Sequence, residues 1–175
     1  EQAKQAFLEL LDQVQTEKAA DEVNYWIARL DFYYLDNKEE GISRLWEVIK
    51  KTPIDSATGA PVDSTYQTYF DYYGRMCYKL GDEKRSDFQR EAFIYFSKAA
   101  SIDNPNRAMS LYRLALLSNI DAETAMDYAS QAWALKEELS QLYQRYVARI
   151  LYQSYQKKGE FDEAVRWYRR YIELK

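Results

Sequence analysis

The sequence of 175 residues contains no histidine and a single cysteine, Cys77. Without histidine, the chain lacks the commonest general base at neutral pH and the commonest transition-metal ligand, and a serine or cysteine nucleophile cannot be paired with histidine. One cysteine excludes an internal disulfide and a thiolate metal cage. We expect Cys77 to be a buried, small apolar residue rather than a reactive thiol.

Glycine and proline are also scarce, with five and three residues. This scarcity argues against a loop-rich or sandwich protein, while helix-forming residues fill most positions between the aromatic ones. We therefore predict an all-α fold. No apolar run approaches the roughly 18–20 residues that a membrane-spanning helix requires, so we expect a soluble chain without membrane insertion. The cellular compartment stays open.

Patterns that carry catalysis are missing as well. The sequence has no glycine-rich loop of the phosphate-binding type. Acidic pairs such as Asp82 with Glu83 lie beside expected turns or helix ends, where acidic side chains favour the first helical turn and water. Residues 55–63 lack the ligand spacing of a calcium loop. We expect no catalytic residue, metal or cofactor; an enzyme would need a deep cleft with converging carboxylates.

Aromatic residues, by contrast, are abundant, with 17 tyrosines, seven phenylalanines and four tryptophans. Near the end of the chain, bulky and small residues stand at the spacings of a two-helix unit: Tyr152, Tyr155, Gly159, Phe161, Ala164, Tyr168 and Tyr171. Gly159 suits a turn that needs positive φ, and Ala164 suits the closest approach of two helices. The pattern resembles the tetratricopeptide repeat, a helical hairpin of about 34 residues.

The same offsets recur around Ala92 and Ala125, and more weakly around Gly41. The resemblance thus implies an α-solenoid of about four irregular repeats in a single superhelical domain over residues 1–175. The repeats are expected at residues 22–53, 66–105, 106–137 and 140–175.

Three further features complete the expected organisation. Apolar residues at helical spacing predict a preceding helix over residues 2–19, which looks like the second half of an earlier repeat. Inserts are expected at residues 54–65 and 82–90. Ser64 or Thr65 is expected to cap the helix that follows the first insert.

The resemblance also implies where a partner binds, because the first helix of each tetratricopeptide repeat lines a concave face. Carried onto this sequence, it selects Tyr146, Arg149, Gln153 and Lys157 on the last repeat, Asp71, Arg75, Tyr78 and Lys79 on the second, and Arg107 on the third. Arg149, Gln153 and Lys157 lie four apart and would present a ladder of donors to an acidic or extended ligand. A merely solvated helix face is the alternative.

Charge is unevenly distributed along the chain. The net charge is −4, yet residues 140–175 carry eight Lys and Arg against four Asp and Glu, a local charge of 8 − 4 = +4. A solvated stripe, with Asp162 pairing with Arg166 and Arg169 with Glu173, is favoured over phosphate binding. We therefore do not expect a nucleic-acid partner.

These observations favour a non-catalytic protein-interaction scaffold that binds an extended or acidic peptide segment of a partner on its concave face. The alternative is a structural subunit of a larger assembly, such as an envelope or secretion assembly. Such a subunit would dock through its C-terminal face around Trp167, Tyr168 and Tyr171. That face would also allow self-association through the uncapped last helix.

Overall fold

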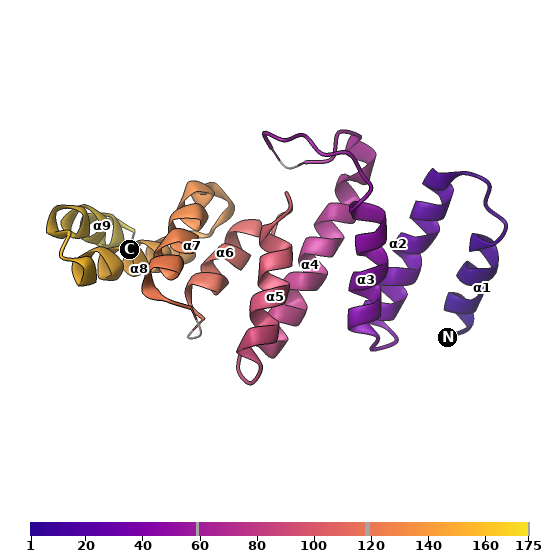
Figure 1. The fold of residues 1–175 in the computed structure, drawn as a ribbon, viewed down its shortest axis with the longest axis horizontal. Coiled ribbons are helices and arrows are strands. Elements are labelled where there is room, and N and C mark those ends of the chain that lie inside the picture. Colours follow the sequence, from indigo (N-terminus) through magenta and orange to yellow (C-terminus); the bar gives the residue numbers. More distant parts are fainter. Residues whose placement is uncertain (59, 118–119, 175) are drawn as a thin grey trace. The chain divides into compact units, whose positions relative to one another are not determined.

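A computed structural model describes residues 1–58, 60–117 and 120–174. The described residues form an all-helical structure, as predicted (Figure 1). Neighbouring helices pack in sequence, α1 with α2, α2 with α3, and so on from α5 to α9. The α-helices are α1 (Gln2–Leu11), α2 (Glu17–Tyr33), α3 (Lys38–Ile49), α4 (Gln67–Lys84), α5 (Gln89–Ala100), α6 (Arg107–Ala115), α7 (Ala122–Ala134), α8 (Gln141–Lys158) and α9 (Phe161–Glu173), with short 3-10 helices η1 (Ser64–Tyr66) and η2 (Lys136–Glu138).

The helices form two compact units. Unit 1 comprises Glu1–Cys77 with Ile102–Asn104, and unit 2 comprises Tyr78–Ser101 with Pro105–Lys175. Unit 1 therefore holds α1, α2, α3 and most of α4, whereas unit 2 holds the end of α4 and all helices from α5 to α9.

The prediction of one helix over residues 2–19 was wrong. The first helix ends at Leu11, and α2 begins at Glu17. Between them Thr16 adopts extended backbone angles, and its hydroxyl accepts a hydrogen bond from the Ala19 N–H at 3.3 Å. This contact satisfies one of the free N–H groups at the start of a helix, so a polar cap starts a new helix inside an apolar pattern.

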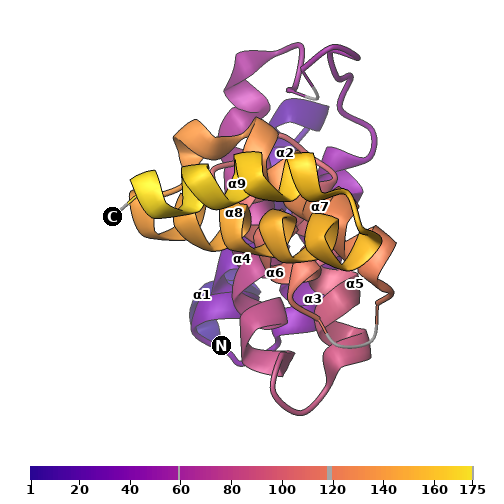
Figure 2. The same ribbon diagram turned by 90° about the vertical axis from the view of Figure 1, so that its left-hand side faces the viewer.

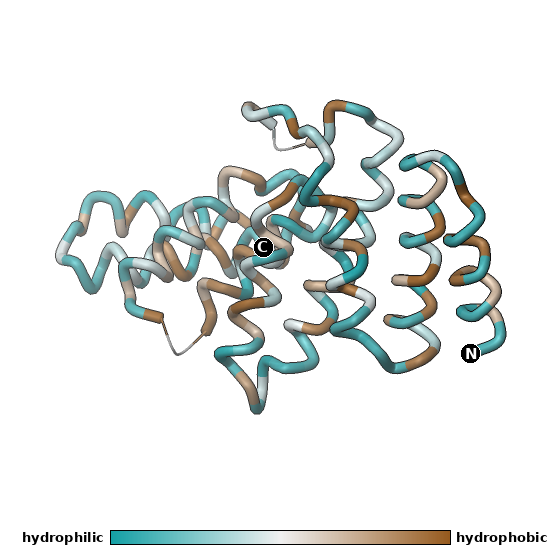
Figure 3. The backbone as a smooth tube through the Cα atoms, turned by 45° about the vertical axis from the view of Figure 1, so that its right-hand side comes forward, coloured by the Kyte–Doolittle hydropathy of each residue, from teal (hydrophilic) through white to brown (hydrophobic). Residues whose placement is uncertain are grey.

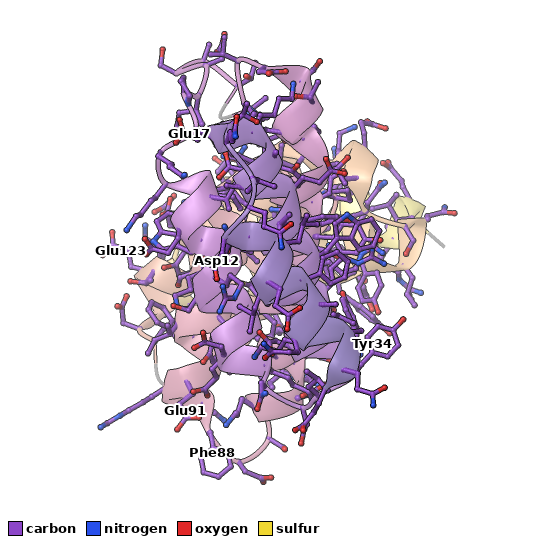
Figure 4. All side chains as sticks on the ribbon, turned by 90° about the vertical axis from the view of Figure 1, so that its right-hand side faces the viewer. Asp12, Glu17, Tyr34, Phe88, Glu91 and Glu123 are labelled. Atoms are coloured by element: carbon purple, nitrogen blue, oxygen red, sulfur yellow. The ribbon has the colours of Figure 1, made fainter. Side chains whose placement is uncertain are left out.

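The prediction that an insert over residues 82–90 forms a long turn was also wrong. Helix α4 continues to Lys84 and α5 begins at Gln89, so only residues 85–88 connect them. Gly81 is not a turn residue: a Cβ atom there would lie 2.9 Å from the ring of Phe96, and the glycine lets α4 approach α5. At the connecting turn, Phe88 projects outward (Figure 4).

The insert at residues 54–65 is a loop, as expected, and Gly59 within it lies outside the described residues. An antiparallel bridge joins Ile54 to Pro61, and the Asp55 carboxylate accepts N–H bonds from two residues that follow it. Asp63, rather than Ser64 or Thr65, caps η1 by accepting the Thr65 N–H at 2.9 Å. A carboxylate is a stronger acceptor than a hydroxyl at a helix start.

Small residues lie where helices approach most closely. A Cβ atom on Gly41 would stand 2.6 Å from the Ala28 carbonyl oxygen of α2, and Ala92 and Ala164 are buried. Cys77 is fully buried, as predicted. Hydrophobic and hydrophilic segments alternate along each helix in Figure 3, as expected of amphipathic helices packed on one side.

Two buried aspartates of α2 fasten its neighbours within unit 1. Asp31 is fully buried and accepts a bond from Lys4 of α1, with 2.6 Å between Nζ and Oδ1. Asp21 accepts a bond from the Tyr66 hydroxyl at 2.9 Å and pairs with Lys51 at 3.1 Å. Because buried carboxylates require such partners, these contacts fix α1, η1 and the turn that follows α3 against α2.

Candidate protein-binding surfaces

An aromatic–arginine surface lies on α2 and α4 in unit 1. Within each helix its aromatic and arginine residues are three or four positions apart, which places them on one face. The surface consists of Tyr25, Trp26, Arg29, Tyr33, Tyr72 and Arg75.

Arg29 lies between two rings. Its guanidinium carbon is 4.6 Å from the centroid of Trp26 and 4.6 Å from that of Tyr72. One guanidinium N–H donates to the Tyr25 hydroxyl at 3.3 Å, whereas Nε has no hydrogen-bond partner. Stacking on aromatic faces orders the cation, and because Nε is buried, a bond to an external acceptor would come from the terminal N–H groups of the guanidinium.

Arg75 extends the same stack from α4. It is exposed, and its guanidinium carbon lies 5.2 Å from the Tyr72 centroid. Among the described residues, no carboxylate forms an ion pair with Arg29 or Arg75. The two positive charges are therefore balanced only by ring faces, which is the electrostatic character of a site for anions.

Two tyrosines near these arginines, Tyr25 and Tyr33, are neutral at physiological pH. Burial raises the pKa of Tyr25 to about 12, although the charge of Arg29 opposes the shift. Burial also raises the pKa of Tyr33, against the opposing charges of Arg75 and Arg29. Neither Tyr25 nor Tyr33 therefore carries a negative charge that would cancel those of the arginines.

The exposed ring of Trp26 adds apolar area beside the cations. Its relative exposure is 39%, high for a tryptophan. A large ring next to ordered guanidinium groups is the composition found at energetically important centres of protein interfaces. The chemistry of the surface thus suits a segment that combines carboxylates with apolar side chains.

Of the predicted binding residues in unit 1, only Arg75 belongs to this surface. The Asp71 carboxylate accepts a bond from Gln67 Nε2 at 2.9 Å, and the same amide donates to the Asp103 carbonyl at 3.3 Å. Asp71 thereby helps to fasten the 102–104 segment. Sequence reasoning missed Trp26, Arg29 and Tyr72, which the three-residue aromatic-to-arginine spacing could have revealed.

The predicted residues of unit 2 divide into packed and exposed sets. Tyr78 is half-buried, its ring centroid 5.8 Å from that of Phe96, so it serves packing more than binding. Tyr146 stacks on Tyr112 at 6.4 Å. Arg107 is half-buried and its Nε has no partner, whereas Lys79 is exposed.

Helix α8 presents the ladder expected from the sequence. Arg149, Gln153 and Lys157 are all exposed. Neither Arg149 nor Lys157 forms an ion pair within the described part of the chain. Their spacing of four residues keeps them on one side of the helix, where they present free donors.

A polar hollow of about 240 Å³ lies between α2 and α3 in unit 1. The carboxylates that line it are Asp21, Glu40 and Glu47. Each is held by a cation, since Asp21 pairs with Lys51, Glu40 with Arg44 and Glu47 with Lys50. The hollow is thus a salt-bridged seam between two helices rather than a cleft with a free acid–base pair.

The described residues also bear on metal-dependent and membrane-spanning functions. They contain no group of three or more histidine, cysteine, aspartate or glutamate residues that could hold a metal ion. Over the same residues, no helix combines the length and the apolar character needed to cross a bilayer.

Comparison with known proteins adds no family. A scan against protein-family models finds no match to this chain, and a search among curated proteins finds no significantly similar sequence. The tetratricopeptide resemblance therefore stays a prediction.

Proposed function

We propose that this chain is a non-catalytic, tetratricopeptide-like scaffold that binds an acidic, extended segment of a partner protein on the aromatic–arginine surface of unit 1. The observation that carries this proposal is the pair Arg29 and Arg75, stacked on the ring of Tyr72 with no carboxylate partner among the described residues. Two ordered cations beside an exposed tryptophan offer both charge-assisted bonds and apolar contact.

The stack lowers the cost of binding. Free arginine side chains lose rotamer freedom when they meet a carboxylate, whereas Arg29 is already held between two rings and by the Tyr25 hydroxyl. In unit 2 the exposed cations Arg149 and Lys157 of α8 supply a second donor face for an acidic partner. Binding that relies on such charges weakens as salt is added.

The proposal is tested by selecting peptides that bind the chain. Random 12-residue peptides displayed on phage are selected on the native chain, and the enriched peptides are measured by fluorescence anisotropy. We expect enrichment of Asp and Glu next to apolar residues. Arg75→Glu should raise the Kd at least tenfold, a change of about 1.4 kcal/mol.

A matched control separates the site from overall charge. Arg90 on α5 is exposed and, like Arg75, has no ion pair within the described residues, so Arg90→Glu changes net charge equally. Its effect on the Kd should stay below about threefold because long-range charge effects are screened. Equal losses for both variants, or selection without acidic enrichment, would contradict the proposed site.

A further inference from the structure

Helix α9 exposes a continuous apolar strip, made of Phe161, Val165, Tyr168 and Ile172. Their relative exposures are 67, 50, 45 and 40%. The spacings of four, three and four residues put these side chains on one face. On its other side α9 lies along α8, where Ala164 is its only buried residue among those described (Figure 2).

The strip is distinct from the C-terminal face expected from the sequence. Trp167 packs edge-on against Trp133 of α7, with 5.0 Å between ring centroids. The ring of Tyr171 lies under Arg145 of α8 at 4.8 Å. Both residues therefore face the interior of unit 2, and of the three expected docking residues only Tyr168 belongs to the exposed strip.

A hollow of about 260 Å³ runs beside the strip, between α8 and α9. It is lined by three strip residues together with Tyr152, Gln156 and Ala164. Its walls are mainly apolar, so it offers space for a side chain that reaches across the strip from another helix.

Two unpaired charges border the strip. Asp162 and Arg169 are exposed, and within the described residues neither forms an ion pair. The sequence predicted that Asp162 pairs with Arg166, but Arg166 pairs with Glu163 instead. Seven residues separate Asp162 from Arg169, so both lie on the same border, about two helical turns apart.

We propose that this strip is the contact surface for a second copy of the chain, with the two α9 helices antiparallel. The strip is symmetric about the point between Val165 and Tyr168. A two-fold rotation there sets Val165 opposite Tyr168 of the second copy and Phe161 opposite its Ile172. The same rotation brings Asp162 near Arg169 of the second copy, and this pair occurs twice because the contact is isologous.

A parallel arrangement lacks this complementarity. In a parallel two-fold pair, the border that carries Asp162 and Arg169 lies on opposite sides of the contact in the two copies, so the two residues do not face each other across it. The charges on the border therefore select the antiparallel pair. This inference is independent of the proposed peptide site, because it uses α9 alone and none of the residues of the aromatic–arginine surface.

The first test is the mass of the chain in solution. One helix pair buries less than the roughly 1,600 Å² of a standard stable interface, so we expect a reversible dimer that forms between about 10 and 500 μM. Sedimentation equilibrium should show that Val165→Glu raises the dimer Kd at least tenfold. Ile94→Glu on α5 is the control, since Ile94 is 50% exposed, as Val165 is. It should leave the Kd within about threefold of native.

A charge exchange tests the orientation. Asp162→Arg and Arg169→Asp should each raise the dimer Kd about fivefold or more, and the double variant should return it to within about twofold of native. Circular dichroism confirms that each variant remains helical. A native chain that stays monomeric at 500 μM, equal effects of the two glutamate variants, or a double variant without rescue would each overturn the antiparallel dimer.

Discussion

The hairpins α2–α3 and α8–α9 are built alike but use their surfaces differently. In each, a left-handed residue follows the first helix, Asp36 with φ of 56° and Gly159 with φ of 77°. Each also has a small residue on the second helix, Gly41 or Ala164. Yet α2 buries two aspartates together with its apolar face, whereas α9 leaves four large apolar side chains exposed. The shared turn and close approach define the hairpin, and the remaining faces define what it contacts.

Arginines over aromatic rings also occur in both hairpins, with different consequences. Arg29 lies over Trp26, a ring that is 39% exposed. Arg170 lies 4.5 Å from the centroid of Trp167, which packs against the core of unit 2. The same pair of residue types therefore belongs to the proposed binding surface in one place and covers a core in the other. Residue type alone does not distinguish these two arrangements. The burial of the tryptophan ring determines which one forms.

The largest expected effect comes from breaking the charge pair that distinguishes α2. Lys4→Met should lower the free energy of unfolding by about 3 kcal/mol, since it removes the close partner of the fully buried Asp31 carboxylate and leaves the more distant Arg44, at 3.9 Å. Lys4→Met combined with Asp31→Leu should recover most of this loss. Urea unfolding followed by circular dichroism measures both. A double variant as unstable as the single one would mean that the two residues are not coupled.

Within each hairpin the two helices approach closely, and the two contacts differ in how well they tolerate a substitution. Gly41→Ala should cost about 2 kcal/mol, because the added Cβ meets the Ala28 carbonyl oxygen, a backbone atom that cannot rotate away. Ala164→Gly on α9 should cost about 1 kcal/mol, mainly from lower helix propensity. Thermal unfolding compares the two variants. A neutral Gly41→Ala would contradict the backbone contact between α2 and α3.

Substitutions at the turns of the two hairpins should have smaller effects on stability, with different signs. Gly159→Ala should cost about 1 kcal/mol from backbone strain alone, because no atom lies within 4 Å of the added Cβ. Asp36→Gly, at the matching turn, should be neutral or stabilising by less than about 1 kcal/mol, since glycine adopts positive φ without strain. Chemical unfolding checks the sign, and destabilisation by Asp36→Gly would show that the side chain outweighs the strain.

The smallest expected effect is the pH dependence of stability that comes from the bonds of Tyr66 and Lys51 to Asp21 in unit 1. Burial and the bond to Asp21 raise the pKa of Tyr66 to about 12, and bonds to Glu17 and Asp21 raise the pKa of Lys51. The folded state thus favours the protonated form of both groups. The stabilisation from Tyr66 is complete below about pH 10 and is lost as pH rises through its folded pKa of about 12, and the stabilisation from Lys51 is likewise lost as pH rises.

Urea midpoints measured between pH 8 and 12 test this dependence. Tyr66→Phe should flatten the alkaline decline relative to the native chain, because it removes one of the titrating groups. An unchanged slope would contradict the link between Tyr66 and Asp21.

Local patterns in the sequence predicted much of the helical framework. Gly159 takes the left-handed conformation expected of a turn glycine, and Cys77 and Ala164 are buried. Helix ends were less predictable. Thr16 divides the expected first helix, and α4 continues through Gly81, because a cap or a close approach can override an apolar pattern.

The candidate surfaces were predictable only in part. Arg149, Gln153 and Lys157 are exposed, as four-residue spacing on a polar face requires. Tyr78, expected to anchor a partner, packs on Phe96 instead. Its ring could face either side of the hairpin on sequence grounds, and only the neighbouring helix determines which side is covered.

By itself the sequence determined the helical class, the turn at Gly159 and the close approach of helices at Gly41, because these depend on residues near in the chain. Tertiary structure alone decided that Lys4 meets Asp31, that Arg29 lies against Tyr72, and that the strip on α9 stays exposed. These features depend on which helical faces meet. That choice is made by packing between residues far apart in the sequence, where local propensity carries no information.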